Sequence, residues 1–294
     1  MKLKFSKIEL RALRKLSAGE ATVGGLAAEL GAKQSFISRV VGRLGEKGLV
    51  ATERRGTARI VRLSPASHAQ KFKQLSDSRP ESKIESWLSG SAIDALIVMG
   101  DGVESSLLFY EAGCSRATLY KVLGKLGSAG AIGKRRGRVW ISDVLVKGFA
   151  SAFADNLQLI LEREAKGLNT SIRVRKHVVL RTDAASVPGF FSLSGISALA
   201  KKGLEANPTS YQDFYFNLDQ KKRSLGVEEC FIHALLLSTL QHQDLPVLSV
   251  FFAKNAGKLD LPGLKKLAST YLVEDAFEEL RQKTEFYEKM RELA

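Results

Sequence analysis

Apolar residues in the first fifty positions recur every three or four residues, a spacing that places them on one face of a helix. The pattern predicts a first helix over 5–17 and a second, shorter helix over 22–31. Thr22 stands where a side chain would cap the second helix, and Gly31 stands where that helix would end. A third helix is expected to start two or three residues later and to run to about Lys47.

The predicted third helix has one apolar face and one polar face. Its apolar positions are Ile37, Val40, Val41 and Leu44. Its outward positions are Gln34, Ser35, Ser38, Arg39 and Arg43. These outward side chains are hydrogen-bond donors that suit phosphates and base edges, so the polar face is a candidate for binding nucleic acid.

After Gly48 the pattern changes from that of a helix to that of strands. The segment "LVATERRGTARIVRLS" is rich in β-branched residues and predicts two strands around a turn, decorated by Arg54, Arg55 and Arg59. Helix, helix–turn–helix and basic hairpin is the order of a winged helix–turn–helix domain. There the third helix fits the major groove, ~12 Å wide, and hairpin arginines can reach phosphates or the minor groove.

A similar phrase returns 82 residues later, where "VVGRLGEKGLVATERRG" at 40–56 aligns with "VLGKLGSAGAIGKRRG" at 122–137. After one residue is lost, the tripeptide Arg-Arg-Gly at 54–56 meets the same tripeptide at 135–137. Identical residues stand opposite Val40, Gly42, Leu44, Gly45 and Gly48. This ordered set of matches indicates one module that is present twice.

The second copy presents different residues at the matching positions. Ser115 would cap its third helix, whereas the first copy has Lys33 there, a poorer cap but a better anion contact. Tyr120 is placed to stack on a sugar or base, or to pack on the other copy. The outward face of this helix carries Arg116, Thr118, Tyr120, Lys121 and Lys125. The second hairpin carries Lys134, Arg135, Arg136 and Arg138.

The remaining pattern suggests a linker and a connecting helix. Residues 66–83 are polar, contain Pro80, and predict a linker or a short exposed helix. Residues 144–167 predict a long connecting helix with one apolar side, which would pack the two copies together or pair one chain with another.

The last part of the chain, 168–294, is expected to be an α+β domain for partner binding or assembly. It begins with alternating residues that predict one strand over 169–184, followed by helices and one aromatic strand. The fold class expected is therefore mainly α with small β wings. Two tandem winged helix–turn–helix domains, over 1–65 and 84–143, would precede the α+β domain.

The charge is concentrated on the first copy. The chain has 45 Lys and Arg against 31 Asp and Glu, which gives a net charge of +14. Residues 1–65 contribute +9 of this excess, 66–143 contribute +3 and 144–294 contribute +2. A basic surface of domain size attracts polyanions and releases their counterions on binding, so nucleic acid is the expected partner.

The sequence lacks the residue sets that the common catalytic and metal sites need. It has no phosphate loop ending in Gly-Lys-Ser/Thr, no His-Glu-x-x-His and no Cys-x-x-Cys. His233 lies in an apolar segment and is expected to be a hydrogen-bonded core histidine, while Cys114 and Cys230 are expected to be reduced thiols. No enzyme activity, cofactor, metal or membrane span is expected, and the opening segment lacks the apolar core of a secretion signal.

The first copy resembles the winged helices of MarR-like regulators. The family pattern of a Ser-Arg pair, apolar residues and a later Gly-Leu-Val stands here as Ser-Arg-Val-Val-Gly-Arg-Leu at 38–44 and Gly-Leu-Val at 48–50. The second copy departs from it, with Tyr120-Lys121 in place of Ser-Arg. The resemblance implies DNA binding, and the departure leaves open whether both copies read bases.

A second resemblance concerns the last part of the chain. The segment "FSLSGISALAKKGL", the "FYF" strand after it and the tail "LDLPGLKKLASTYLVEDAFEEL" are similar to the carboxy-terminal domain of AbiE-type antitoxins. That resemblance implies an autorepressing antitoxin encoded beside a nucleotidyltransferase toxin, which would bind through this domain. The bacterial family has one winged domain where this chain has two.

The expected function is a cytoplasmic transcriptional regulator that binds specific double-stranded DNA. Its modules would occupy successive major grooves, about 34 Å apart, whether the chain is a monomer with pseudo-dimeric domains or a homodimer. The base-edge candidates are Gln34, Ser38, Arg39, Arg116 and Thr118. The phosphate or minor-groove candidates are Arg43, Arg54, Arg55, Arg59, Lys125, Arg135, Arg136 and Arg138. The alternatives are an architectural nucleic-acid binder without sequence preference and a winged-helix scaffold that binds proteins.

Overall fold

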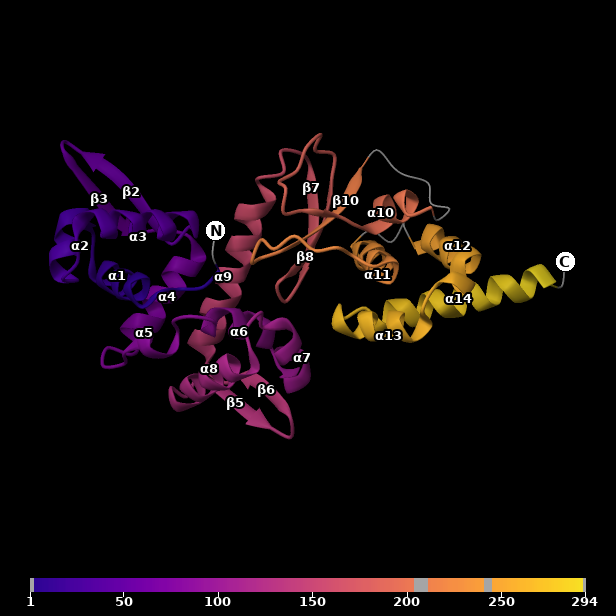
Figure 1. Cartoon of the computed structure of the whole chain (residues 1–294), viewed down its shortest axis with the longest axis horizontal. Coiled ribbons are helices and arrows are strands. Elements are labelled where there is room, and N and C mark those ends of the chain that lie inside the picture. Colours follow the sequence, from indigo (N-terminus) through magenta and orange to yellow (C-terminus); the bar gives the residue numbers. More distant parts are fainter. Residues whose placement is uncertain (1–2, 204–210, 241–244, 293–294) are drawn as a thin grey trace. The chain divides into compact units, whose positions relative to one another are not determined.

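The protein is a mainly helical α+β chain. A computed structural model describes residues 3–203, 211–240 and 245–292. This described part contains fourteen α-helices and three antiparallel sheets, two of three strands and one of four (Figure 1). The chain divides into two compact units, an amino-terminal unit, Met1–Ile160, and a carboxy-terminal unit, Leu161–Ala294.

Three helices and a three-stranded sheet form what we call the first module. Ser6 begins α1 with a capping box, in which its hydroxyl accepts from the Glu9 amide and the Glu9 carboxylate accepts from the Ser6 amide. Thr22 caps α2 as predicted. The elements of the first module are α1 (Lys7–Ala18), β1 (Ala21–Thr22), α2 (Val23–Glu29), α3 (Gln34–Glu46), β2 (Val50–Arg55) and β3 (Ala58–Leu63).

The same order of elements recurs in what we call the second module. Residue numbers differ by 82 between corresponding starts, as from Val23 to Ser105 and from Gln34 to Arg116. The predicted repeat is therefore confirmed in the order and length of its middle elements. The second module consists of α6 (Ala92–Met99), β4 (Val103–Glu104), α7 (Ser105–Glu111), α8 (Arg116–Ser128), β5 (Ile132–Arg135) and β6 (Arg138–Ile141).

The two hairpins differ more than the sequence alignment indicates. Val61 pairs with Ala21 in the first module and Val139 pairs with Val103 in the second, so the last strands are offset by 78 residues. Since the helices are offset by 82, the second hairpin is shorter by four residues, whereas the alignment removed only one. The Arg-Arg-Gly tripeptides share a place near the hairpin tips but not a ladder position, because Arg54 pairs with Arg59 and Arg135 pairs with Arg138.

Residues 66–83, expected to be a linker or a short exposed helix, contain a helix with one buried face. This helix is α4 (Ser67–Asp77), and α5 (Ile84–Trp87) follows it. His68, Phe72 and Leu75 of α4 are fully buried. The segment is therefore part of the packed unit, because its sparse apolar residues fall at helical spacing among the polar ones.

The long helix α9 (Val144–Glu162) supplies apolar residues to the same core. Its Phe149 and Phe153 are fully buried and lie within ring contact of Phe5, while Phe72 lies edge-on to Phe149. Among the described residues α9 is the one helix with the length and mean hydropathy, 1.3, of a membrane span. A core helix has the same composition, so this match is weak support for a membrane role.

The carboxy-terminal unit contains the four-stranded sheet, in the order β7-β8-β10-β9. Where one strand was predicted over 169–184, the chain forms two, because Arg175 adopts a left-handed φ of 55° and reverses the chain without the usual glycine or asparagine. The strands are β7 (Asn169–Val174), β8 (His177–Thr182), β9 (Ser192–Leu193) and β10 (Gln212–Asn217). The helices are α10 (Gly195–Lys201), α11 (Val227–Ser238), α12 (Leu245–Asn255), α13 (Leu261–Thr270) and α14 (Glu274–Glu292).

Candidate nucleic-acid interface

The polar face of α3 is exposed as the sequence predicted. Ile37, Val40, Val41 and Leu44 are buried against the first module and hold the opposite face outward. Lys33 stands at the helix start without a side-chain cap, so the free amides of the first turn remain open to an anion. The exposed donors are Lys33, Gln34, Ser35 and Arg39, and Ser38 is half-buried beside them.

Arg43 is less available than its place on α3 suggests. Its Nε lies 3.3 Å from Oε1 of Glu9, a buried carboxylate of α1, although 43% of the Arg43 side chain is exposed. Lys47 approaches the same oxygen from the end of α3, with Nζ at 3.0 Å. Arg43 is therefore part of an internal ion cluster as well as a candidate phosphate contact.

The Glu9 cluster shifts the pKa of both buried partners. Burial opposes the charged form of Glu9, but the hydrogen bonds from Ser6 and the charge of Lys47 lower its pKa below the ordinary value. Burial also lowers the pKa of Lys47, and Glu9 offsets part of that effect. Lys47 further donates to the carbonyl of Lys4 at 2.9 Å and lies over the ring of Phe5. The cluster therefore links the end of α3 to α1 and to the segment that precedes α1.

The arginines of the first hairpin are exposed but not equally free. Arg55 is held by the carboxylates of Glu20, at 2.7 Å, and Glu53, at 3.4 Å. Arg59 donates to the Thr52 hydroxyl, and Arg54 donates to the carbonyl of Gly56. Within the described chain Arg54 and Arg59 have no acidic partner, so both contribute unneutralised charge to this hairpin.

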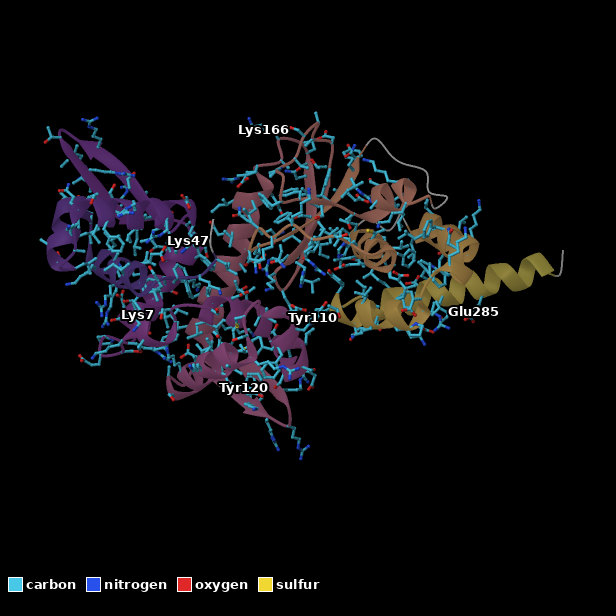
Figure 2. All side chains as sticks on the ribbon, viewed as in Figure 1. Lys7, Lys47, Tyr110, Tyr120, Lys166 and Glu285 are labelled. Carbon is cyan, nitrogen blue, oxygen red and sulfur yellow. The ribbon has the colours of Figure 1, made fainter. Side chains whose placement is uncertain are left out.

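The second module presents an aromatic cluster at the start of α8. Ser115 caps α8 as predicted, by accepting from the amide of Thr118, and its hydroxyl also lies 2.9 Å from that of Thr118. Tyr120 contacts the ring of Phe109 at 5.2 Å, and the Arg116 guanidinium lies 5.8 Å from the same ring. Tyr120 remains 58% exposed on the surface of this module (Figure 2).

The other cations of the second module lie on α8 and on the hairpin. Lys121, Lys125, Arg135 and Arg136 are exposed and have no acidic partner in the part of the chain that the structure describes. Arg138 lies 4.0 Å from Glu104. Arg136 has a φ of 47° and Gly137 a φ of 82°, which together make the tight two-residue turn of a hairpin.

All seventeen predicted contact residues therefore lie at or near the surface of a module. Two aromatic side chains that the sequence analysis did not single out lie among these candidates: Phe109 beside Tyr120, and Phe36, which is 37% exposed under the Arg39 guanidinium. An aromatic residue on the polar face of an amphipathic helix is the signal that would have found Phe36.

A second candidate, a Ser–His pair in the carboxy-terminal unit, belongs to the core. Nδ1 of His233 lies 2.7 Å from Oγ of Ser194, and both side chains are fully buried. Burial, with the charges of His177 and Arg223, lowers the pKa of His233 well below its usual value. The predicted hydrogen-bonded core histidine is thus confirmed. Among the described residues no group of three or more His, Cys, Asp or Glu side chains could hold a metal.

Comparisons with known proteins add no further guide to this interface. No protein-family model matches the chain, and neither a curated protein nor a solved structure gives a significant match.

Proposed function

We propose that the protein is a transcriptional regulator that binds specific double-stranded DNA through two winged helix–turn–helix modules. In each module the third helix, α3 or α8, would enter the major groove, and the hairpin would contact the phosphates or the minor groove beside it. The carboxy-terminal unit would serve partner binding or assembly.

One observation carries the proposal. In both modules a thirteen-residue helix with an exposed face and a neighbouring arginine-tipped hairpin carry basic side chains that have no acidic partner among the described residues. Unneutralised cations on a protein surface repel one another and gain free energy when they replace the counterions of a nucleic acid. The net charge of +9 on residues 1–65 points the same way.

The test is a competition between DNA duplexes, followed by fluorescence anisotropy. Genomic fragments selected by the protein should bind at least ~10³-fold more tightly than random duplex of equal length and salt. Equal affinity for all duplexes would replace the proposal with the architectural binder. Absence of duplex binding in dilute buffer, together with binding of a protein partner that survives Arg54→Ala and Arg135→Ala, would replace it with the scaffold.

The narrower role of an antitoxin depends on the family resemblance of the carboxy-terminal segments alone. It requires that a nucleotidyltransferase toxin bind the carboxy-terminal unit. Purification of the chain with the product of its neighbouring gene checks this role. A neighbour of another class, or no complex, would remove the antitoxin role and leave the regulator in place.

A further inference from the structure

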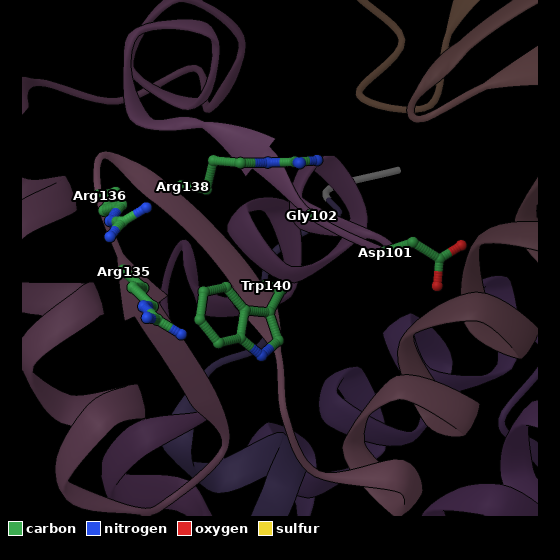
Figure 3. Close-up of a pocket in the computed structure, with 6 residues that line it drawn as sticks. All are labelled: Asp101, Gly102, Arg135, Arg136, Arg138 and Trp140. Carbon is green, nitrogen blue, oxygen red and sulfur yellow. The ribbon is translucent and has the colours of Figure 1, made fainter.

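The hairpin of the second module carries an open cavity, and the aromatic ring in its lining, Trp140, has no part in the DNA-binding proposal. Its volume is about 540 Å³, and it is lined by Asp101, Gly102, Arg135, Arg136, Arg138 and Trp140. Figure 3 shows the indole of Trp140 between Arg135 and Asp101, with Arg136 and Arg138 around the same opening. A flat aromatic ring and three arginines therefore share one concave surface.

Gly133 of β5 allows the indole to lie against the hairpin. Gly133 and Trp140 are cross-strand partners, and a Cβ placed on Gly133 would lie 2.5 to 2.8 Å from three atoms of the indole. Any larger residue at 133 would therefore displace the ring. The Trp140 Nε1 group has no hydrogen-bond partner among the described residues, so a donor is also left open beside the ring.

The first hairpin shows that the fold itself does not need this arrangement. When the two hairpins are aligned by the pairing of their last strands with β1 and β4, Ala51 and Arg62 correspond to Gly133 and Trp140. Ala51 and Arg62 are also cross-strand partners. The equivalent pair thus holds no aromatic ring. A half-exposed tryptophan on a glycine is a feature of the second hairpin alone within these two modules.

The charge of the cavity favours an anion. Arg135 and Arg136 have no acidic partner within the described chain, and Arg138 has only Glu104, at 4.0 Å. Asp101, the acidic residue of the lining, pairs with Lys147 of α9. A ligand that fits must therefore offer a planar ring to the indole and a negative charge to the guanidinium groups.

We propose that this cavity binds one nucleotide with an unpaired base. The base would stack on Trp140, and its phosphate would be held by Arg135, Arg136 and Arg138, since stacking on aromatic rings beside a basic groove is how proteins hold single strands. The inference deepens the proposed function, because the unpaired nucleotide can belong to a strand of the bound nucleic acid. A free mononucleotide has the same chemistry, and the experiment separates the two sources.

Tryptophan fluorescence of the full chain reports on this cavity directly. The chain has two tryptophans, and Trp87 is only 4% exposed, so quenching by added nucleotide arises mainly from Trp140. The titrants are a twelve-nucleotide single strand, a mononucleotide and a blunt duplex. We expect the single strand or the mononucleotide to quench, and quenching by the mononucleotide alone would identify a free nucleotide as the ligand.

Three variants make the result specific. Trp140→Ala should weaken binding of the quenching titrant at least tenfold by anisotropy, while Trp140→Phe, which keeps an aromatic face, should retain most of it. Arg62→Ala, at the same ladder position of the first hairpin, is the matched control and should change single-strand binding by less than twofold. Circular dichroism checks that each variant is folded.

The inference and the proposed function fail in different ways. If duplex DNA binds normally but no unpaired nucleotide quenches Trp140, or if Trp140→Ala binds single strands as well as the native chain, the inference is overturned. Quenching by blunt duplex alone overturns it too, since no unpaired base is then needed. If nucleotides quench Trp140 while no duplex binds, the cavity stands and the regulator does not.

Discussion

Glu9 of α1 forms ion pairs with Arg43 of α3 and with Lys47 at the end of α3. The residue is 2% exposed, and its carboxylate is held by Ser6, Arg43 and Lys47, with Lys47 equally buried. Removal of one member of a buried ion pair leaves the other charge without compensation. Glu9→Gln keeps the hydrogen bond of the capping box but leaves the buried charge of Lys47 without its partner. The free energy of unfolding should therefore fall by about 3 kcal/mol in urea titrations.

A double variant separates charge from shape at this site. Glu9→Gln together with Lys47→Met removes both buried charges and should recover part of the loss seen with Glu9→Gln alone. A double variant that is less stable than the sum of the single ones would contradict this account of the cluster.

Acidification should weaken the same cluster. The pKa of Glu9 is lower in the folded protein than its ordinary value of 4.5, so the unfolded chain binds more protons between the two values. The stabilisation by Glu9 is therefore complete above about pH 4.5 and is lost as the pH falls through the lowered pKa. The stability difference between native protein and Glu9→Gln should shrink from pH 6 to pH 3.

Arg43 shows why the sequence predicted residues less well than elements. The helical spacing correctly placed Arg43 away from the apolar face of α3. It could not show that Glu9, 34 residues earlier, would lie within 3.3 Å, because the crossing of α1 and α3 is set by packing between them. Partners distant in sequence decide which surface cations remain free.

Among elements, the end of α3 is a site where one module differs from the other in a testable way. Gly48 and Gly130 occupy the same repeat position, with φ of 71° and 68°. A Cβ on Gly48 would lie 3.0 Å from Oδ1 of Asn156 and 3.1 Å from Cδ1 of Ile160 on α9, whereas nothing lies within 4 Å of a Cβ on Gly130. Both positions need a residue that adopts the left-handed backbone conformation, but only Gly48 also needs the absence of a Cβ, because α9 lies close to it.

Alanine at each glycine should separate the two requirements. Gly130→Ala should cost about 1 to 2 kcal/mol for the left-handed conformation. Gly48→Ala should cost a further ~1 kcal/mol or more, because the methyl group overpacks α9. Thermal and urea unfolding measure the stability loss of both variants. Equal losses would contradict the close packing of α9 against Gly48.

The hairpins show where pattern reasoning stops at the element scale. The capping residues, the helix lengths and the existence of both hairpins could be predicted from local spacing, because each depends on neighbours in sequence. The four-residue difference in hairpin length could not, since the repeated Arg-Arg-Gly suggested equivalent tips. The hairpin over 169–182 was missed for a similar reason: Arg175 takes a conformation that a sequence pattern assigns to glycine.

For the whole molecule, the sequence predicted mixed helices and small sheets, and the structure has them. It also predicted concentrated charge, which depends on composition and needs no coordinates. What it could not supply is the packing of α9 against Phe5 and of α4 against α9, because aromatic residues far apart in the sequence meet only in the folded unit.

Salt dependence tests the proposed duplex binding and shows whether one or both modules take part in it. The slope of log affinity against log salt is negative, and its magnitude, called the slope below, falls by about 0.9 for every phosphate that a variant no longer neutralises. Arg39→Ala with Arg54→Ala should therefore lower the slope by up to ~2, since both cations lack acidic partners in the described chain. Lys121→Ala with Arg135→Ala should lower it similarly if the second module lies on the same duplex.

Arg281→Ala, which removes a cation already paired with Glu278 and Glu285, is the control and should leave the slope unchanged. A slope unaffected by the second pair would confine duplex binding to the first module, and a slope unaffected by either pair would end the regulator proposal.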